Sequence, residues 1–585
     1  MLSVSTIGPQ QNDPLWQVAK AFLLSQCLRE CQSCQPMSVS APKASPAELC
    51  RRRPDITLFL LGFLWTVLVM PADPHKMVSD THRRFKSATW IWSGTDPGGR
   101  LPGVGGVGHY WDGVGQSLVF VPIDIVLSTF GIAEFETRYS ITARFLFPII
   151  NGLVLLLSWH ALRQLGFKAR SCSLGTLVTL CCTTLTFHFQ NNQENPLMLA
   201  YALVAIIGIL KWNDSGSILW LNIACIAQAA SVTIRVTNLA YVLPLFGLPL
   251  LSRAFDGFRA WDLRYEIRQM SKMATVAVPW LLLAFAIDRW WQWVRFGTVY
   301  GTYYSVFQKW AEDNFDNLPA GYPFTVPFLE GFAGQLISPA KGVLFYEPLV
   351  GAALLVWLSK KAEFSPRTKA LTLIGCVAIV GTAIGLARLI SWDSDPNWGP
   401  RYLATPAHLM ELAIAGWIVS NLEPQTWIKR LLVLGGICLM ALQISGIWWP
   451  AYHEVIVANA KRGPEYVKTT SELWTRGLST VNSELHKEWV IINRPIGVAK
   501  DIARQITLPK DEWLAGAPPM RMIWPTGTLN SLSTTTRWAV RLAWLAAVAA
   551  AVWLARQSVI GPATERNTDR FESQSNRKSS STGKL

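Results

Sequence analysis

The sequence predicts an all-α, polytopic membrane protein: a bundle of about twelve transmembrane helices with further helices on its outer face. Half of the 585 residues are hydrophobic and only 16% are charged, whereas soluble domains carry about 25% charged residues. Many apolar runs are long enough, or nearly long enough, to cross a lipid core about 30 Å thick. The bases gather in the short segments between these runs and in the two tails, a pattern typical of multi-pass membrane proteins.

The formal net charge of +15 raises nucleic acid as a partner. A nucleic-acid-binding protein gathers its bases on one face, but here they are spread over short loops and tails, where anionic lipid headgroups attract them. We therefore expect membrane lipids, and no nucleic acid, among the partners.

The first crossing follows a base-rich start. Residues 1–54 lack an apolar segment of their own and read as a mostly disordered cytoplasmic stretch ending in "RRR" at 51–53. Because bases beside a membrane helix stay on the cytoplasmic side, the run Ile56–Met70 should carry the chain outward.

A large first outer loop, residues 72–137, should carry two surface helices. In "SDTHRRFKSATWIWSG" (79–94), Ser79 can cap a helix whose residues Phe85, Ala88 and Trp92 share one face. The stretch 115–131 is apolar but contains Pro122 and Asp124 and has no flanking bases, so we place it on the outer face and not across the membrane.

Alternate crossings then follow from the remaining loops. The base-rich segments 163–170, 252–272, 359–369 and 421–430 should be inside, which places 188–196, 296–348 and 391–402 outside. The predicted division is a cytoplasmic segment (1–54), a transmembrane domain (55–450), an outer-face segment or small cap (451–535), a last transmembrane helix (536–556) and a disordered cytoplasmic tail (557–585).

The outer segments share a set of ionisable side chains near the membrane. They are Asp80, Glu194, Arg235, Lys341 and Arg401. Ionisable groups at this depth are costly, and they are functional candidates by default. Two acids with several bases suit an anionic, lipid-linked substrate whose phosphate binds Arg and Lys.

The order of these motifs resembles that of the GT-C class of membrane glycosyltransferases, which includes the protein O-mannosyltransferases and the lipid A aminoarabinose transferases. The resemblance covers residues 55–420 through four short motifs. These are an early acid followed by Arg-aromatic in "SDTHRRF", the second surface helix in "YWDGVGQSLVFVPIDIV", and the outer segments "KGVLFYEP" and "NWGPRYLATP". Two departures stand out, since Phe85 replaces a usual Tyr and Glu194 stands where several members have Asp.

The resemblance implies transfer of a sugar from a polyprenyl-phosphate donor to a lipid, glycan or protein acceptor. The reaction would take place on the outer face of a membrane, for which we expect the bacterial inner membrane. The implied roles are general base for Asp80 with help from Glu194, and donor-phosphate binding for Arg401, Lys341 and Arg235. Further site residues by position in the motifs are Arg84, Arg138, Tyr402 and Tyr346.

No metal ligands are assigned from the sequence, because His82 and His109 read as ordinary surface histidines. No cofactor is assigned from the sequence, and a divalent metal stays open. The main alternative is a polytopic transporter or lipid flippase without glycosyl transfer. An O-antigen-ligase-like transferase and an inactive assembly protein with the same architecture are the other rivals.

Overall fold

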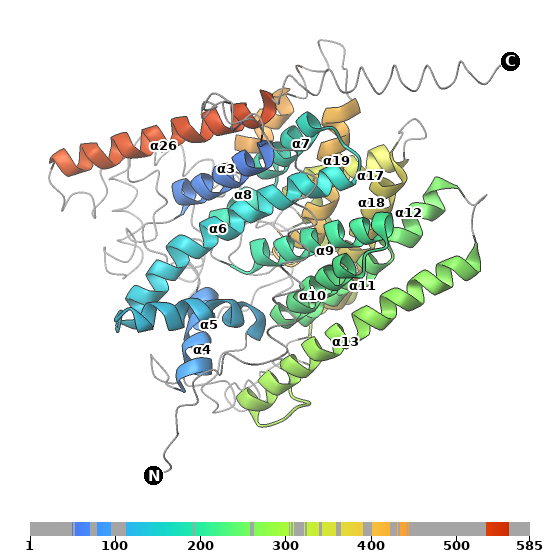
Figure 1. Cartoon of the computed structure of the whole chain (residues 1–585), viewed down its shortest axis with the longest axis horizontal. Coiled ribbons are helices and arrows are strands. Elements are labelled where there is room, and N and C mark those ends of the chain that lie inside the picture. Colours follow the sequence, from blue (N-terminus) through green and yellow to red (C-terminus); the bar gives the residue numbers. More distant parts are fainter. Residues whose placement is uncertain are drawn as a thin grey trace, which may run out of the picture. The chain divides into compact units, whose positions relative to one another are not determined.

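Every regular element in the described part of the chain is a helix (Figure 1). The computed structural model describes, apart from a few single positions, residues 53–70, 79–94, 113–190, 193–257, 262–302, 324–338, 342–358, 364–389, 400–421, 433–441 and 534–560. The helices are α3 (Pro54–Val69), α4 (Ser79–Ser93), α5 (Val114–Thr129), α6 (Phe135–Gln164), α7 (Ala169–Cys182), α8 (Leu185–Gln190), α9 (Asn195–Ser215), α10 (Ile218–Ile234), η3 (Val236–Asn238), α11 (Leu239–Phe246), α12 (Leu248–Asp256), α13 (Leu263–Phe296), α15 (Phe328–Ile337), α16 (Val343–Tyr346), α17 (Pro348–Leu358), α18 (Pro366–Leu386), α19 (Ala404–Asn421) and α26 (Thr534–Ile560).

Six of these helical stretches are long and apolar enough to cross a membrane, by length and composition. They are Phe135–Gln164, Asn195–Ser215, Val236–Asp256, Leu263–Phe296, Pro366–Leu386 and Leu542–Ile560. Shorter apolar helices, α3, α5, α7, α10 and α17 among them, accompany these six. The predicted all-α, multi-pass class is thus confirmed over the described residues, and the total of about twelve crossings stays a prediction.

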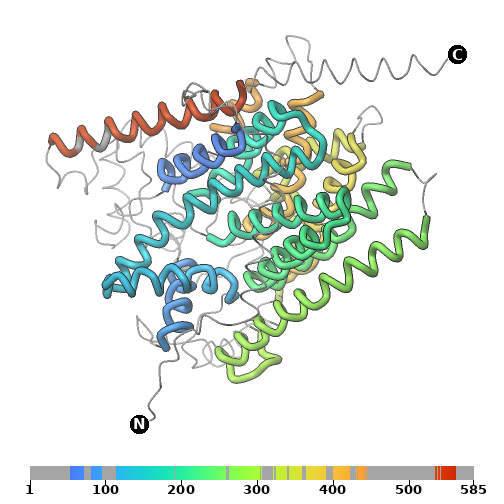
Figure 2. The backbone as a smooth tube through the Cα atoms, viewed as in Figure 1, coloured from blue at the N-terminus to red at the C-terminus, as the bar shows by residue number. Residues whose placement is uncertain are grey.

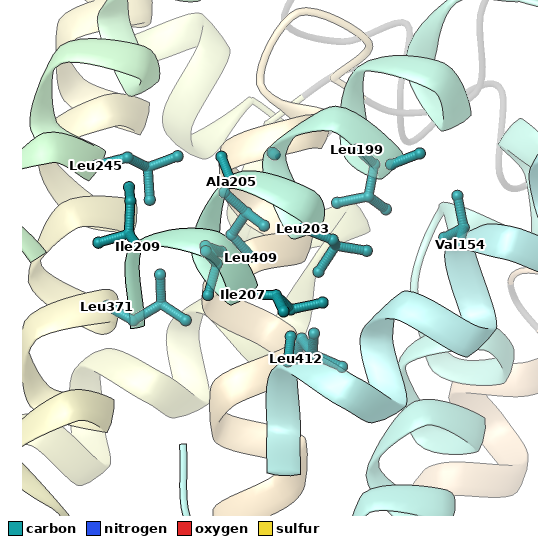
Figure 3. Packing of buried hydrophobic residues seen from close by; sticks show 14 of the residues in the cluster. Val154, Leu199, Leu203, Ala205, Ile207, Ile209, Leu245, Leu371, Leu409 and Leu412 are labelled. Carbon is teal, nitrogen blue, oxygen red and sulfur yellow. The ribbon is translucent and has the colours of Figure 1, made fainter. Parts of the chain in front are cut away.

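Helix α9 lies at the centre of the bundle. Most of it, 83%, is buried by its neighbours, whereas only 17% of the apolar stretch of α13 is buried. Its side chains Leu203 and Ile209 pack with Val154 of α6, Leu245 of α11 and Leu409 of α19 in the main apolar cluster (Figure 3). Burial at this level makes α9 the scaffold of the bundle and leaves the exposed apolar surface of α13 for lipid.

The sequence of α9 explains both of its ends. Pro196 stands in its first turn, where its missing N–H costs nothing. Gly216 ends the helix with φ of 67°, a left-handed conformation that glycine adopts without strain. At 1.5 Å per residue, its 21 residues span about 30 Å, close to the thickness of a lipid core. Residues just before α9 and those at its C-terminus therefore lie at opposite ends of the bundle.

The two predicted helices of the first outer loop are present as α4 and α5. Both lie at the end of the bundle where α6 begins, with axes turned away from those of α6 and α9 (Figures 1 and 2). The buried carboxylate of Asp124 joins them, because it accepts hydrogen bonds from Thr89 Oγ1 (2.6 Å) and Trp92 Nε1 (2.7 Å) of α4. It also accepts one from Arg138 Nε of α6 at 2.6 Å. A buried charge with these partners explains why a short apolar helix carries an acid.

Described residues from three of the four base-rich segments that the sequence places inside (163–170, 252–272 and 359–369) meet at the other end of α9. Arg253 of α12 forms a two-pronged ion pair with Glu266 of α13 at 2.6 and 2.7 Å. Arg367 of α18 pairs with Asp214 of α9 and donates to the carbonyl oxygen of Gln164 of α6 at 2.8 Å. The described helix ends therefore form two separate polar groups, as alternate crossings require.

Two predicted boundaries differ from the structure. The last helix, expected over 536–556, runs from Thr534 to Ile560 and so extends beyond the predicted range at both ends. Helix α6 begins at Phe135, so the first outer loop ends a few residues earlier than residue 137. The predictions for residues 1–49, 451–533 and 561–585 lie outside the described residues.

Candidate functional site

Seven of the nine predicted site residues have described side chains. Arg84, Glu194, Arg235, Arg401 and Tyr402 meet in one place, and Arg138 and Tyr346 lie elsewhere. The backbone of Asp80 belongs to α4, but its side chain and the whole of Lys341 lie outside the described residues. Their roles stay predictions.

A buried carboxylate surrounded by three guanidinium groups forms the centre of the site, which we call the arginine cluster. Glu194 is completely buried. It is paired with Arg84 and Arg235, and Arg401 Nη2 lies 3.0 and 3.3 Å from its two oxygens. Arg84 Nη1 also donates to Gln116 Oε1 of α5 at 2.8 Å. Each charged side chain thus has a partner of opposite sign, which burial demands.

Each member of the cluster comes from a different element of the fold. Arg84 lies on α4, and Glu194 immediately precedes α9, where the positive end of the helix dipole favours a carboxylate. Arg235 occupies the extended residue between α10 and η3, and Arg401 stands in the turn before α19. The chain folds so that four distant segments meet at a single acid.

Glycine at the start of α5 allows this close approach. A Cβ on Gly113 would lie 2.0 Å from the carbonyl oxygen of Ile234, the last residue of α10. Only glycine lets the two backbones touch there. This contact holds α5, and with it Gln116, beside the segment that carries Arg235.

The pKa of Glu194 lies well below its usual range. Burial by itself would raise this pKa, but the guanidinium groups of Arg235, Arg401 and Arg84 outweigh that effect. The carboxylate is therefore ionised at every physiological pH. The three guanidinium groups thus stabilise the ionised form of this buried carboxylate.

The cluster carries more positive than negative charge. Within this set of four side chains, three guanidinium groups face one carboxylate, which leaves two formal positive charges. The side chain of Arg235 is 17% exposed and its guanidinium lies 5.1 Å from the ring centroid of the half-buried Tyr402. A partly open, net positive group of guanidiniums is suited to bind an anion such as a phosphate.

Two of the predicted site residues serve other parts of the structure. Arg138 pairs with Asp124 and donates to the carbonyl oxygens of Ala133 (2.7 Å) and Ile132 (3.2 Å), so it holds the junction of α5 and α6. Tyr346 is buried beside Phe187. Neither has a described contact with the arginine cluster.

A second polar cluster, not predicted from the sequence, lies inside the bundle and consists of Glu347, His408 and Glu411. His408 and Glu411 are three residues apart on α19, and Glu347 separates α16 from α17. His408 Nε2 lies 3.2 Å from Glu347 Oε1, and all three side chains are buried. Among the described residues, they are the group of His, Cys, Asp and Glu side chains with a spacing that could hold a metal ion.

A signal for this cluster was present in "HLME" at 408–411. A histidine and an acid at i and i+3 on an apolar helix share one face and carry ionisable groups into the membrane region. Both residues lie outside the outer-loop motifs that carry the predicted site.

Comparison with known proteins assigns no family. No protein-family model and no curated protein matches the chain. Among solved structures, ArnT from Cupriavidus metallidurans bound to undecaprenyl phosphate matches 86% of this chain and 76% of its own, with 15% identity and a TM-score of 0.40. The same protein in the apo state matches 85% and 75%, with 14% identity and a TM-score of 0.37. Likenesses at these values are too weak to place this chain in a family.

Proposed function

We propose that the protein is a membrane glycosyltransferase of the GT-C type, which moves a sugar from a polyprenyl-phosphate donor to an acceptor on the outer face of the membrane. The observation that carries the proposal is the arginine cluster, in which Arg84, Arg235 and Arg401 surround one buried carboxylate at the end of the bundle that carries α4 and α5. A lipid phosphate in the membrane surface reaches this end, and a net positive, partly open group of guanidiniums stabilises its charge.

Asp80 is the proposed general base. Residue 80 stands one turn before Arg84 in α4, and residues at i and i+4 lie on the same face of a helix. The early acid of "SDTHRRF" therefore belongs to the same helix face as a member of the arginine cluster. It would take the proton of the acceptor hydroxyl or amine while that atom attacks the anomeric carbon of the sugar.

The leaving group in this reaction is the lipid phosphate, which departs as an anion. It needs positive charge more than it needs a proton, and Arg401 with Arg235 would supply that charge. Glu194 holds the guanidiniums in place before the donor binds. Lys341 remains a further candidate for the phosphate by its place in the motif.

Asp80→Asn tests the catalytic part of the proposal. The change keeps the size of the side chain and removes the base, so glycosyl transfer should fall by about two to four powers of ten. Binding of the donor should persist because the phosphate contacts lie elsewhere. Asp262→Asn is a matched control, since Asp262 caps α13 at the base-rich end of the bundle.

Mass spectrometry of cell-surface glycans from strains carrying either variant gives the readout, with a strain lacking the gene as reference. Wild-type glycosylation by Asp80→Asn would refute the assignment of the base. Identical glycans with and without the gene would refute the transferase itself.

Arg401→Lys tests the phosphate-binding part. Lysine keeps the charge and loses the planar, two-pronged geometry. Loss of one charge-assisted hydrogen bond costs about 1.5–3 kcal/mol, roughly ten- to a hundredfold in affinity. Titration of undecaprenyl phosphate into the protein in nanodiscs measures this affinity. An affinity unchanged by Arg401→Lys would leave Arg401 with a purely structural role.

A transporter without glycosyl transfer is the second candidate. The observation in its favour is the buried pair Glu347 and Glu411 inside the bundle, because transporters place ionisable side chains along their substrate path. Such a protein would leave surface glycans unchanged by Asp80→Asn and would move its substrate across vesicle membranes.

A further inference from the structure

The second polar cluster brings together three side chains of the types that bind metal ions. One ligand atom from each of Glu347, His408 and Glu411 can be chosen so that all lie within 4.8 Å of one another. His408 and Glu411 share a face of α19, and Glu347 reaches them from the turn before α17. This convergence involves no residue of the arginine cluster.

Glu411 adds an independent observation. Its side chain is completely buried, and neither carboxylate oxygen has a hydrogen-bond donor among the described residues. An unsatisfied buried carboxylate is among the most costly groups in a protein interior. A second acid, Glu347, faces the same space and adds repulsion. The two buried acids therefore need positive charge beside them, from a metal cation or from a proton.

We propose that Glu347, His408 and Glu411 bind a divalent transition-metal ion, zinc in the first instance. Imidazole nitrogen and carboxylate oxygen are both zinc ligands, with bonds of about 2.0–2.2 Å. Two carboxylates, one neutral imidazole and one divalent cation sum to zero charge. Ligands of one tetrahedral zinc lie about 3.4 Å apart, so the widest pair must close by at most roughly 1.4 Å, which side-chain rotation supplies.

The surroundings of the three side chains fit a metal centre. The backbone N–H of Thr184, just after α7, donates to Glu347 Oε2 at 3.0 Å and fixes this carboxylate. The hydroxyl group of Thr184 contacts Glu347 and lies 3.2 Å from His408 Nε2. Such contacts orient metal ligands, and three-ligand zinc sites commonly take a water as the fourth ligand.

The ion would join three segments of the fold, the end of α7, the turn before α17, and α19. The neighbouring positions Val350, Ala407 and Ile414 are buried and apolar, and the ring of His188 lies 5.8 Å from that of His408. Arg401 stands seven residues before His408 in the chain that leads into α19. A metal at His408 would thus stiffen the helix beside the arginine cluster without taking part in it.

Metal analysis of the purified full-length chain tests the proposal. After loading with zinc and removal of free ions, the wild type should retain about one zinc ion per chain. Glu411→Gln keeps the shape and removes one charge, so its zinc content should fall at least tenfold. His408→Gln should do the same, which covers the case that one variant fails to fold.

Glu266→Gln is the matched control, since Glu266 is an equally buried acid paired with Arg253 at the base-rich end. It should keep its zinc. Stripping the wild type with a chelator should lower its melting temperature, and zinc should restore it; Glu411→Gln should respond to neither. A parallel titration with manganese shows which ion the site prefers.

A shared proton between Glu347 and Glu411 is the competing explanation, and it predicts opposite results. The wild type would then hold no stoichiometric metal after loading, and Glu411→Gln, which mimics a protonated acid, would be as stable as the wild type. Either result overturns the proposal, as does zinc retained by Glu411→Gln. Because no donor or acceptor enters these measurements, failure of the metal site and failure of the transferase are distinguishable.

Discussion

Glu194→Gln probes the arginine cluster most directly. Glutamine keeps the volume and one acceptor oxygen and removes the only negative charge among Arg84, Arg235, Arg401 and residue 194. The formal charge of this set then changes from +2 to +3 in a site where Glu194 is completely buried. Breaking a buried ion pair costs about 3–5 kcal/mol, and we expect the free energy of unfolding to fall by that amount.

The matched control is Glu136→Gln. The side chain of Glu136 is 49% exposed and pairs with His82 at 3.1 Å. An exposed pair of this kind is worth at most about 1 kcal/mol. Both variants replace a paired glutamate by glutamine, so the difference between their losses of unfolding free energy measures the effect of burying the pair.

A double variant separates charge balance from packing. Adding Arg235→Gln to Glu194→Gln returns the formal charge of the set to +2. Arg235→Gln should therefore lower the free energy of unfolding less in the Glu194→Gln protein than in the wild type. Residues that share one network show coupling of about 0.5–3 kcal/mol. Equilibrium unfolding in mixed micelles of rising dodecyl sulfate content, followed by the fluorescence of the 28 tryptophans, measures all the variants.

The pH dependence has a defined sign. The pKa of Glu194 is lowered in the folded protein, chiefly because Arg235, Arg401 and Arg84 outweigh the opposing effect of burial. Its contribution to stability is therefore fully present above the unfolded-state pKa of about 4.3 and is lost progressively as pH falls below it. The difference between wild type and Glu194→Gln should be constant from pH 8 to pH 5. An unchanged unfolding free energy for Glu194→Gln, or strict additivity with Arg235→Gln, would refute the reasoning.

Two further predictions concern the helices that carry the site. Asp124→Asn leaves the buried guanidinium of Arg138 without its counter-charge and weakens two hydrogen bonds to α4. Limited proteolysis should therefore cut near α4 and α5 much faster than in the wild type. Equal rates would show that other contacts hold these helices. Gly113→Ala places a methyl group 2.0 Å from the Ile234 carbonyl oxygen and should lower the melting temperature. In the control Gly385→Ala the new methyl group meets nothing within 4 Å, so the melting temperature should stay the same or rise. Equal melting temperatures for the two variants would show that α5 and α10 shift apart at no cost.

The sequence predicted the elements better than their contacts. Periodicity and the capping residue located the helix from Ser79, because these signals are local. The partner of Arg84 was not predictable in this way, since a neighbouring acid in its own helix is always the nearer choice in sequence. The structure pairs Arg84 with Glu194, 110 positions away, and Arg401 with the same acid, 207 positions away.

The acids inside the bundle show the same limit. From the sequence, Asp124 indicates that residues 115–131 do not cross the membrane. The sequence does not reveal that Asp124 accepts hydrogen bonds from Arg138 and from Thr89 of α4. His408 and Glu411 share a helix face through their i, i+3 spacing, but Glu347 has no such local signal. Only the packing of α7, α17 and α19 brings them and His408 together.

Helix α4 is held at two points of different kinds, Arg84 in the arginine cluster and Thr89 with Trp92 on Asp124. Two attachments along a rigid rod determine both its tilt and its rotation. The position of residue 80 is thus set by the bundle and not by the chain on either side of α4. Insertions or deletions in those connecting segments can accumulate without moving it. Loop length and loop sequence are therefore free to diverge between proteins that keep the same geometry, whereas a change at Glu194 or Asp124 weakens one of the two attachments of α4.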